Sequence, residues 1–373
     1  MKIGIMTMHR VQNIGSVLQA YALQRAIEKC GCEAELIDYE FPPVYRRGFS
    51  MNGLIKGLYA IAIDALKGFS NKKRLSLLSK FRNKYFKCSP DSYDREMINV
   101  NPPKYDIYCT GSDQVWNPLH VGKDTSFMLD FIPTWSRCFS YASSFATSSI
   151  ADTLVPVYKK ELSKYDFITV REETGVNLIK QIVGKDSSVV CDPTLLLQPE
   201  EWNQIASDSK IQLPSKYILV YLLRYMFDPR PGFYSIVRKV QENLKLPVIY
   251  FEGSLSEMLQ KKSKVISGVG PSDFIKIVSN ASFVITDSFH GTAFASLYNV
   301  PMIGVVNDSD IGDSRLASLR HIVGGENSIV RIGSSSSFTL NEDFEKYKCD
   351  YSLLLSFQDK SRRMLEMMID NCK

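Results

Sequence analysis

The sequence has no apolar run long enough to cross a membrane. Hydrophobic residues make up 45% of its 373 residues, but no stretch approaches the roughly 20 apolar residues that a transmembrane helix needs. The opening residues, 1–6, have the pattern of a strand and lack the apolar segment and cleavage site of a secretory signal. We therefore expect a globular protein of the cytoplasm.

The eight cysteines also lack the spacing of a metal site. No Cys-x-x-Cys occurs, and Cys30-Gly-Cys32 is too tight for a usual zinc pair. Cys109 and Cys191 lie inside apolar patterns that are typical of strands. We therefore expect reduced structural thiols and no bound metal.

Several motifs of cofactor binding and catalysis are missing as well. No Gly-x-Gly-x-x-Gly follows a strand pattern, and Gly268-Val-Gly270 is too short to replace it. The chain has no phosphate-binding loop ending in Gly-Lys-Ser/Thr, no His-Glu-x-x-His and no Gly-x-Ser-x-Gly. A nicotinamide or flavin dinucleotide site is not expected, and we predict no bound cofactor.

Positive charge is concentrated in one segment. The chain carries 45 basic and 40 acidic residues, which gives a net charge of +5. Between Tyr45 and Lys87 there are eleven basic residues and one acid, Asp64, so this segment carries +10 and the rest of the chain −5. The basic residues of the segment are Arg46, Arg47, Lys56, Lys67, Lys72, Lys73, Arg74, Lys80, Arg82, Lys84 and Lys87.

The same segment has an apolar face at helical spacing between residues 54 and 66. A basic amphipathic helix can lie on an anionic membrane surface, so peripheral membrane contact through 45–87 is one interpretation. The other is a charged insertion that packs its apolar stripe on its own domain. We expect no nucleic-acid partner, because no base-stacking or groove-reading motif accompanies the charge.

Strand and helix patterns alternate along the chain, which is typical of α/β proteins with mostly parallel sheets. The predicted strands are 2–6, 35–39, 105–110, 137–142, 167–170, 188–191, 217–223, 248–251, 283–286 and 300–306. The predicted helices are 16–30, 156–164, 233–244, 271–280, 292–298 and 351–372.

This alternation predicts two Rossmann-like α/β domains. The first covers 1–195 and contains the basic insertion, the second covers 196–345, and a terminal helix lies within 346–373. A cleft between two such domains is the natural place for a ligand.

The most informative stretch is Phe283–Tyr298, which reads as a strand, a short polar loop and a helix. Its loop contains Asp287, Ser288, His290 and Gly291. Parallel sheets bind ligands at this end of their strands, and the start of a helix suits a phosphate or a carboxylate. A histidine there is a candidate acid or base. Asp and Ser before a helix are, however, also ordinary caps.

Short polar residues follow strand patterns in the first half too. They suit sugar hydroxyls, and Asp113 is a candidate base, but the same residue types commonly form turns and caps. The candidate binding residues of this kind are Asn13, Gly15, Gln19, Ser112, Gln114 and Asn117. Trp116 has the chemistry to stack on a sugar, although we expect it in the core.

Six motifs in order resemble those of the polysaccharide pyruvyl transferase family. Together they cover residues 1 to about 310. The motifs are Asn13-Ile-Gly-Ser-Val-Leu-Gln-Ala-Tyr-Ala-Leu-Gln24, Gly111-Ser-Asp-Gln-Val-Trp-Asn117, Arg171-Glu172-Glu173, Cys191-Asp-Pro-Thr194, Gly270-Pro-Ser-Asp-Phe274 and Thr286-Asp-Ser-Phe-His-Gly-Thr292.

The resemblance implies a two-domain fold similar to the GT-B glycosyltransferases. It also implies transfer of a pyruvyl group from phosphoenolpyruvate, as co-substrate, to a sugar of a surface-polysaccharide precursor, which forms a pyruvate ketal. His290 matches the family histidine and is the expected acid/base or phosphate contact. Asp287, Ser288, Gly291 and Thr292 would complete the donor loop, and the candidate binding residues of the first half would contact the acceptor sugar. If the acceptor is a lipid-linked oligosaccharide, the basic segment would bring the enzyme to the inner face of the membrane.

One departure affects the donor. Many members carry Arg two residues before this histidine, whereas this chain has Ser288. Arg171, Arg224 and Arg315 are the candidates to supply the missing anion contact, and Arg171 is equally a candidate ion-pair partner of Glu172 or Glu173. Two other functions therefore stay open: a GT-B-like glycosyltransferase that uses a nucleotide sugar, and a non-enzymatic sugar-binding paralogue.

Overall fold

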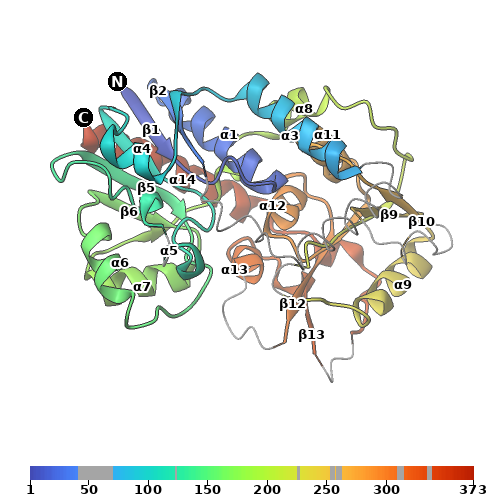
Figure 1. Ribbon diagram of the computed structural model, residues 1–373. Helices are drawn as coiled ribbons and strands as arrows, with labels where there is room; N and C mark the ends of the chain where they lie inside the picture. Colours follow the sequence, from blue (N-terminus) through green and yellow to red (C-terminus); the bar gives the residue numbers. More distant parts are fainter. Residues whose placement is uncertain are drawn as a thin grey trace, which may run out of the picture. The chain divides into compact units, whose positions relative to one another are not determined.

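The computed structural model describes residues 1–40, 70–121, 124–224, 227–252, 257, 263–308, 315–333 and 338–373. They form two compact units, each built on one parallel sheet (Figure 1). The first unit takes in 1–40, Leu78–Leu196 and Gln358–Lys373, and the second takes in 70–77 and Leu197–Phe357. The part of the basic segment before residue 70 lies outside the described residues.

The first unit contains a seven-stranded sheet in the order β3-β2-β1-β4-β5-β6-β7. All of its pairs are parallel, with Ile3 opposite Ile107 and Tyr108 opposite Cys138. The strands are β1 (Lys2–Met6), β2 (Glu33–Tyr39), β3 (Cys88–Tyr93), β4 (Ile107–Thr110), β5 (Arg137–Ser143), β6 (Phe167–Val170) and β7 (Ser188–Val189).

Helices that follow the strands bury apolar faces against this sheet. They are α1 (Ile14–Lys29), α4 (Arg95–Val100), α5 (Pro118–Val121), α6 (Val155–Leu162) and α7 (Glu173–Val183), with short 3₁₀ turns η2 (Ser126–Met128) and η3 (Pro193–Leu195). Trp116 is fully buried, with its ring 5.4 Å from that of Phe145 and 5.8 Å from that of Tyr165. The expectation that Trp116 packs in the core is confirmed.

The second unit contains a six-stranded parallel sheet in the order β10-β9-β8-β11-β12-β13. Its strands are β8 (Ile218–Tyr221), β9 (Val248–Phe251), β10 (Ser263–Ile266), β11 (Phe283–Thr286), β12 (Met302–Asn307) and β13 (Ile329–Ile332). Both central strands, β8 and β11, are apolar and buried along their whole length, as parallel strands covered on two faces require.

The helices of this unit connect successive strands. They are α8 (Pro199–Ala206), α9 (Phe233–Leu244), α11 (Pro271–Ser279), α12 (Phe289–Leu297) and α13 (Arg315–Ile322), with 3₁₀ turns η4 (Glu326–Ser328) and η5 (Phe344–Tyr347). Two further helices, α3 (Ser70–Tyr85) and α14 (Tyr351–Cys372), each contain a unit boundary. None of the described helices is both long and apolar enough to span a membrane.

The predicted fold class, two α/β bodies with parallel sheets, is confirmed. The structure also corrects three details of the sequence analysis. Three strands were missed, β3, β10 and β13, and the predicted strand 188–191 is only two residues long. The predicted helix 292–298 begins earlier, at Phe289, so His290 and Gly291 belong to its first turn and not to a loop. The predicted cleft between the domains stays a prediction.

Candidate functional site

Two groups of buried polar side chains lie where parallel strands end, one in each unit. In the first unit, a group that we call the Asp113 network consists of Ser16, Gln19, Ser112, Asp113, Arg171 and Asp192. In the second unit, a group that we call the α12 cap consists of Tyr221, Thr286, Asp287, Ser288, His290 and Gly291. Strands of a parallel sheet bring such residues to one edge, where ligands bind.

Arg171 is the central charge of the Asp113 network. Its Nη1 donates to Asp192 Oδ2 at 2.9 Å, and its Nη2 lies 3.5 Å from Asp113 Oδ1. Burial alone would lower the pKa of Arg171, but Asp192, Asp113 and Glu172 outweigh it and raise that pKa. The described ion pairs of Arg171 are thus to two aspartates, where the sequence suggested Glu172 or Glu173.

The neutral members of the network bind the same two acids and each other. Ser16 donates to Asp113, and the Ser112 hydroxyl lies 3.2 Å from Asp192 Oδ2. Gln19 accepts from the Ser112 backbone N–H at 3.0 Å. Four predicted site residues, Gln19, Ser112, Asp113 and Arg171, therefore meet in one buried network. Whether they contact a sugar stays a prediction.

The backbone of this loop takes a conformation that few residues adopt. Asp113 has φ 74° and Gly111 has φ 126°. A Cβ on Gly111 would lie 2.1 Å from the carbonyl oxygen of Tyr141, so only glycine fits there. Left-handed backbone at a non-glycine residue is concentrated at functional sites, which keeps Asp113 a candidate.

The other acceptor candidates have the local roles that the sequence offered as alternatives. Asn13 caps α1, because its Oδ1 accepts from the N–H groups of Gly15 and Ser16 at 2.8 and 3.3 Å. Asn117 accepts from the N–H of Leu119 at 2.9 Å and donates to Gln114 Oε1 at 2.8 Å. Capping explains these side chains without a ligand, and their sugar contacts stay predictions.

The α12 cap is built from side chain to backbone hydrogen bonds. Thr286 donates to the carbonyl of Tyr221 at 2.6 Å and accepts from the N–H of Ser288 at 3.0 Å. Ser288 is the N-cap of α12 and accepts from the N–H of Gly291 at 3.2 Å. Thr292 donates to the Ser288 carbonyl at 3.0 Å. The motif thus holds the first turn of the helix next to the end of β8.

Asp287 joins the ends of the two central strands. Its carboxylate accepts from the backbone N–H groups of Leu223 and Arg224 at 2.6 and 2.8 Å. Burial raises the pKa of Asp287, although these two N–H groups act in the opposite direction. Arg224, which has φ 52°, is therefore positioned by its backbone beside the cap.

Gly291 and His290 lie in the first turn of α12. A Cβ on Gly291 would lie 2.7 Å from Thr286 Oγ1 and 3.1 Å from the Tyr221 ring. Glycine is therefore required here for packing on β8 and β11. His290 is 7% exposed, and its ring meets the edge of Phe289 at 5.4 Å between centroids.

The structure adds Arg74 to the predicted residues of the second unit. Arg74 lies on α3, whose first half packs on the loop before α11: a Cβ on Gly268 would lie 3.0 Å from the Ser70 carbonyl oxygen. Burial raises the pKa of Tyr221, while a hydrogen bond to Ser288 and the charge of Arg74 lower it. The Nε of Arg74 is buried and has no hydrogen-bond partner within the described part of the chain.

From the sequence, Arg74 is only one of the basic residues of 45–87, because linear order does not show which of them faces β8. Arg315, another candidate, is the first residue of α13 and follows undescribed residues 309–314. A surface pocket of about 590 Å³ lies elsewhere in this unit and is lined by none of the predicted site residues. Its lining comes from residues 327–331 and 338–347.

Comparisons with known proteins agree with this architecture. The family model for polysaccharide pyruvyl transferase matches residues 13–309. No curated protein matches the sequence significantly.

Solved structures of similar fold include UDP-GlcNAc 2-epimerases. The enzyme from Neisseria meningitidis bound to UDP-GlcNAc has a TM-score of 0.52 and 10% identity, with 99% of this chain and 100% of that chain covered. The enzyme from Rickettsia bellii has a TM-score of 0.51 and 11% identity over 99% and 96%. At such identities the likeness concerns the fold alone, and that fold is the predicted GT-B-like one.

Proposed function

Because the chain belongs to the polysaccharide pyruvyl transferase family, we propose that it transfers a pyruvyl group from phosphoenolpyruvate to a sugar of a surface-polysaccharide precursor. The product is a pyruvate ketal on two sugar hydroxyls, and inorganic phosphate is released. The observation that carries this proposal is the family match, whose residues 13–309 contain both the Asp113 network and the α12 cap.

The reaction makes three chemical demands. A proton must reach the methylene carbon of phosphoenolpyruvate, the sugar hydroxyls must lose their protons as they bond to its central carbon, and phosphate must leave. We assign proton delivery or phosphate contact to His290, which the first turn of α12 positions. Asp113 is the proposed base toward the acceptor, and Arg171 Nη2 lies 3.5 Å from its Oδ1.

The donor carries a phosphate and a carboxylate, so its site needs positive charge and oriented N–H groups. The N-terminus of α12 contributes the positive end of a helix dipole. Ser288 caps that helix, and cations from other elements must replace the arginine found there in many members. Arg74 and Arg224 are the proposed replacements. The support is that the charge of Arg74 acts on Tyr221, where it lowers the pKa, and that the backbone N–H of Arg224 donates to Asp287.

A thermal-shift comparison tests the donor class. The full chain is heated with phosphoenolpyruvate, with UDP or CDP sugars, or alone, in wild type and in His290→Ala. At 100 times its dissociation constant the true donor stabilises the fold by about 2.7 kcal/mol. The expected result is stabilisation by phosphoenolpyruvate that His290→Ala abolishes. His321→Ala is the matched control, because this histidine of α13 is exposed and pairs with Glu326.

Two other results would replace the proposal. Stabilisation by a nucleotide sugar alone would make the chain a glycosyltransferase of GT-B type, which Ser288 and the fold leave possible. Unchanged cellular polysaccharide in a His290→Ala strain, with the protein folded, would indicate a non-enzymatic sugar-binding protein.

Membrane contact is a separate part of the proposal. The support is the charge of residues 45–87, of which 70–85 form α3 in the structure. Because a deletion would remove this helix, the better test replaces Arg46, Arg47, Lys56 and Lys67 by Gln in the full chain. Loss of sedimentation with vesicles that contain anionic lipid supports peripheral binding, and unchanged sedimentation contradicts it.

A further inference from the structure

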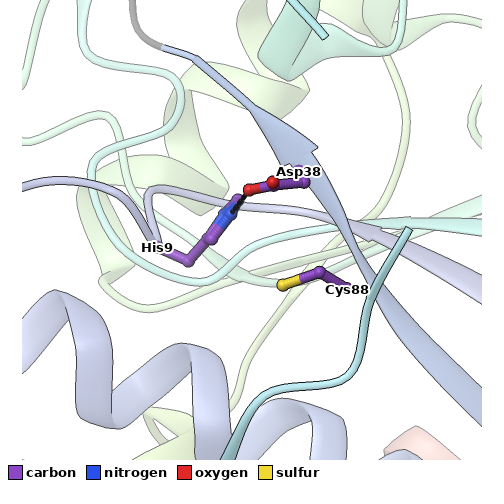
Figure 2. A group of neighbouring side chains, drawn as sticks. All are labelled: His9, Asp38 and Cys88. Carbon is purple, nitrogen blue, oxygen red and sulfur yellow. Dashed lines mark hydrogen bonds and ion pairs between the residues drawn. The ribbon is translucent and has the colours of Figure 1, made fainter. Parts of the chain in front are cut away.

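Three side chains of metal-ligating type meet in the first unit although they are far apart in sequence. His9 follows β1, Asp38 lies in β2 and Cys88 is the first residue of β3. Figure 2 shows the His9 ring pointing at Asp38, with the Cys88 sulfur near both. The imidazole nitrogen, a carboxylate oxygen and the sulfur all lie within 4.8 Å of one another. No linear spacing connects these residues, which is why the sequence predicted no metal.

The two ring nitrogens of His9 both contact hydrogen-bond acceptors. Its Nδ1 lies 3.1 Å from the carbonyl oxygen of Thr7, and its Nε2 lies 3.0 Å from Asp38 Oδ1. Both partners are acceptors. A neutral imidazole that donates from Nδ1 would therefore point the Nε2 lone pair at a carboxylate oxygen. Such an arrangement is favourable only when a second proton or a metal ion lies between the two atoms.

The donor set selects a class of metal. Nitrogen, sulfur and carboxylate oxygen together suit Zn²⁺ and similar ions, whereas Mg²⁺ and Ca²⁺ prefer oxygen alone. Ligand atoms around tetrahedral Zn²⁺ lie about 3.3–3.7 Å apart, given bonds of about 2.0–2.3 Å. Within the 4.8 Å limit, shifts of about 1 Å at most bring every pair into that range.

We propose that His9 Nε2, the Asp38 carboxylate and Cys88 Sγ form a binding site for a divalent transition metal of the Zn²⁺ class, with a fourth position for water or a ligand oxygen. The Thr7 carbonyl fixes the His9 tautomer, as outer partners of metal-bound histidines do. The Cys88 sulfur makes no hydrogen bond to the described residues, so no such bond must break before it binds an ion.

Arg10 competes with a metal ion for the Asp38 carboxylate and so affects metal affinity. Arg10 donates from Nε to Asp38 Oδ1 at 2.6 Å and from Nη2 to Oδ2 at 2.5 Å. A metal must displace the first contact, while the second can remain and orient the carboxylate. Binding releases the thiol proton of Cys88, because the thiolate is the form that ligates a metal.

The site connects to the Asp113 network through one residue. The Thr7 carbonyl faces His9, and the Thr7 hydroxyl donates to the Ser112 carbonyl at 3.2 Å. Gln19 in turn donates to that hydroxyl at 2.9 Å. Metal occupancy would thus fix the loop after β1, which supports the predicted acceptor residues.

Cobalt titration of the full chain tests the site, because Co²⁺ substitutes for Zn²⁺ and reports its ligands by absorption. After treatment with chelator, wild type should develop tetrahedral Co²⁺ bands and a sulfur-to-cobalt charge-transfer band, and Zn²⁺ should abolish both. Cys88→Ser should lose the charge-transfer band and bind Co²⁺ at least tenfold more weakly. Asp38→Asn should weaken binding with the band retained. The control is Cys30→Ser, another partly buried thiol outside the cluster, which should behave as wild type.

Either of two results overturns the proposal. One is the absence of tetrahedral Co²⁺ bands in folded wild type, which would mean that a second proton on His9 satisfies Asp38. The other is an unchanged charge-transfer band in Cys88→Ser, which would place any bound ion at another cysteine. Neither test uses a His9 variant. Such a variant would take the ring away from both acceptors, which puts its folding at risk.

Discussion

The Asp113 network and the α12 cap both lie where strands of a parallel sheet end, but their buried acids have different partners. The network brings an arginine between two buried aspartates, so charge faces opposite charge. The cap has hydroxyl, carboxylate and backbone groups around a helix start, and its acid accepts from two backbone N–H groups. Buried acids of one family motif set are thus stabilised in two ways, by an arginine in the first unit and by backbone N–H groups in the second.

The largest effect on stability should come from breaking the network. Asp192→Asn removes the shorter of the two described ion pairs of Arg171, and we expect a loss of about 3 kcal/mol in the free energy of unfolding, because a buried charge that loses a partner is costly. Urea denaturation measures it. Asp186→Asn, at a surface carboxylate that is 95% exposed, is the control and should change little. Equal stability of the two variants would show that the network carries no charge-dependent stability.

For activity the order of the variants should be reversed, with a larger effect of His290→Ala than of Asp192→Asn. His290→Ala should lower the rate of transfer by about 10²–10⁴-fold if His290 supplies the proton. The free energy of unfolding should change less than in Asp192→Asn. Steady-state kinetics and urea denaturation on the same preparations give both numbers. A variant that unfolds while its remaining folded fraction keeps full activity would move His290 into the class of structural residues.

A packing change sharpens the description of the cap. Gly291→Ala places a methyl group 2.7 Å from Thr286 Oγ1, and overpacking of this kind typically costs about 1–3 kcal/mol. Gly31→Ala, at a glycine of left-handed conformation with nothing within 4 Å of its Cβ position, is a control for backbone strain alone. Thermal unfolding of both variants separates contact from strain. No loss in Gly291→Ala would mean that the first turn of α12 moves easily.

Arg74 offers a smaller and more specific change. Arg74→Met should weaken phosphoenolpyruvate binding by about tenfold, equivalent to about 1.4 kcal/mol, which is the scale of one charge-assisted contact. Lys72→Met, at an exposed position of the same helix, is the matched control for lost charge. Calorimetric titration measures both affinities. Equal affinities for the two variants would remove Arg74 from the donor site.

The smallest effect is the pH dependence of stability, and its sign differs between one aspartate of the second unit and one of the first. Burial holds the pKa of Asp287 above its ordinary value of 3.8, so its contribution is fully present below that value and is lost as pH rises through the folded-state pKa. Asp130 of the first unit is the contrasting case. Burial would raise its pKa, but hydrogen bonds from Arg95 and Thr125 lower it. Its contribution is present above 3.8 and is lost as pH falls.

Unfolding measured between pH 3 and 7 checks this sign. The difference in unfolding free energy between variant and wild type should favour Asp287→Asn more at pH 7 than at pH 4. For Asp130→Asn this difference should be more favourable at pH 4. The same sign in both variants would contradict the assigned causes.

Most of the fold was predictable, and the failures share a physical cause. Strands such as Phe283–Thr286 and Val248–Phe251 are buried on both faces, so their apolar runs mark them at the correct bounds. The three missed strands, β3, β10 and β13, lie at sheet edges. There, Cys88-Ser-Pro-Asp-Ser-Tyr93 can include a proline and an acidic residue without breaking a ladder on both sides.

Within the candidate site, residue types were easier to predict than partners. Ser288 and Asp287 were expected near the start of a helix, and the structure places both there. That Arg171 faces Asp192, that Arg74 approaches Tyr221 and that Cys88 joins His9 depend on packing between distant segments. Local patterns carry no information on such contacts.

The central claim is that the α12 cap binds phosphoenolpyruvate, and ³¹P NMR of this ligand with the full chain tests it most directly. The account predicts that wild type broadens or shifts the phosphoenolpyruvate resonance, that His321→Ala does the same, and that His290→Ala leaves the resonance as in the free ligand. An unchanged phosphoenolpyruvate resonance with wild type, together with broadening of the two phosphorus signals of a UDP sugar, would contradict it.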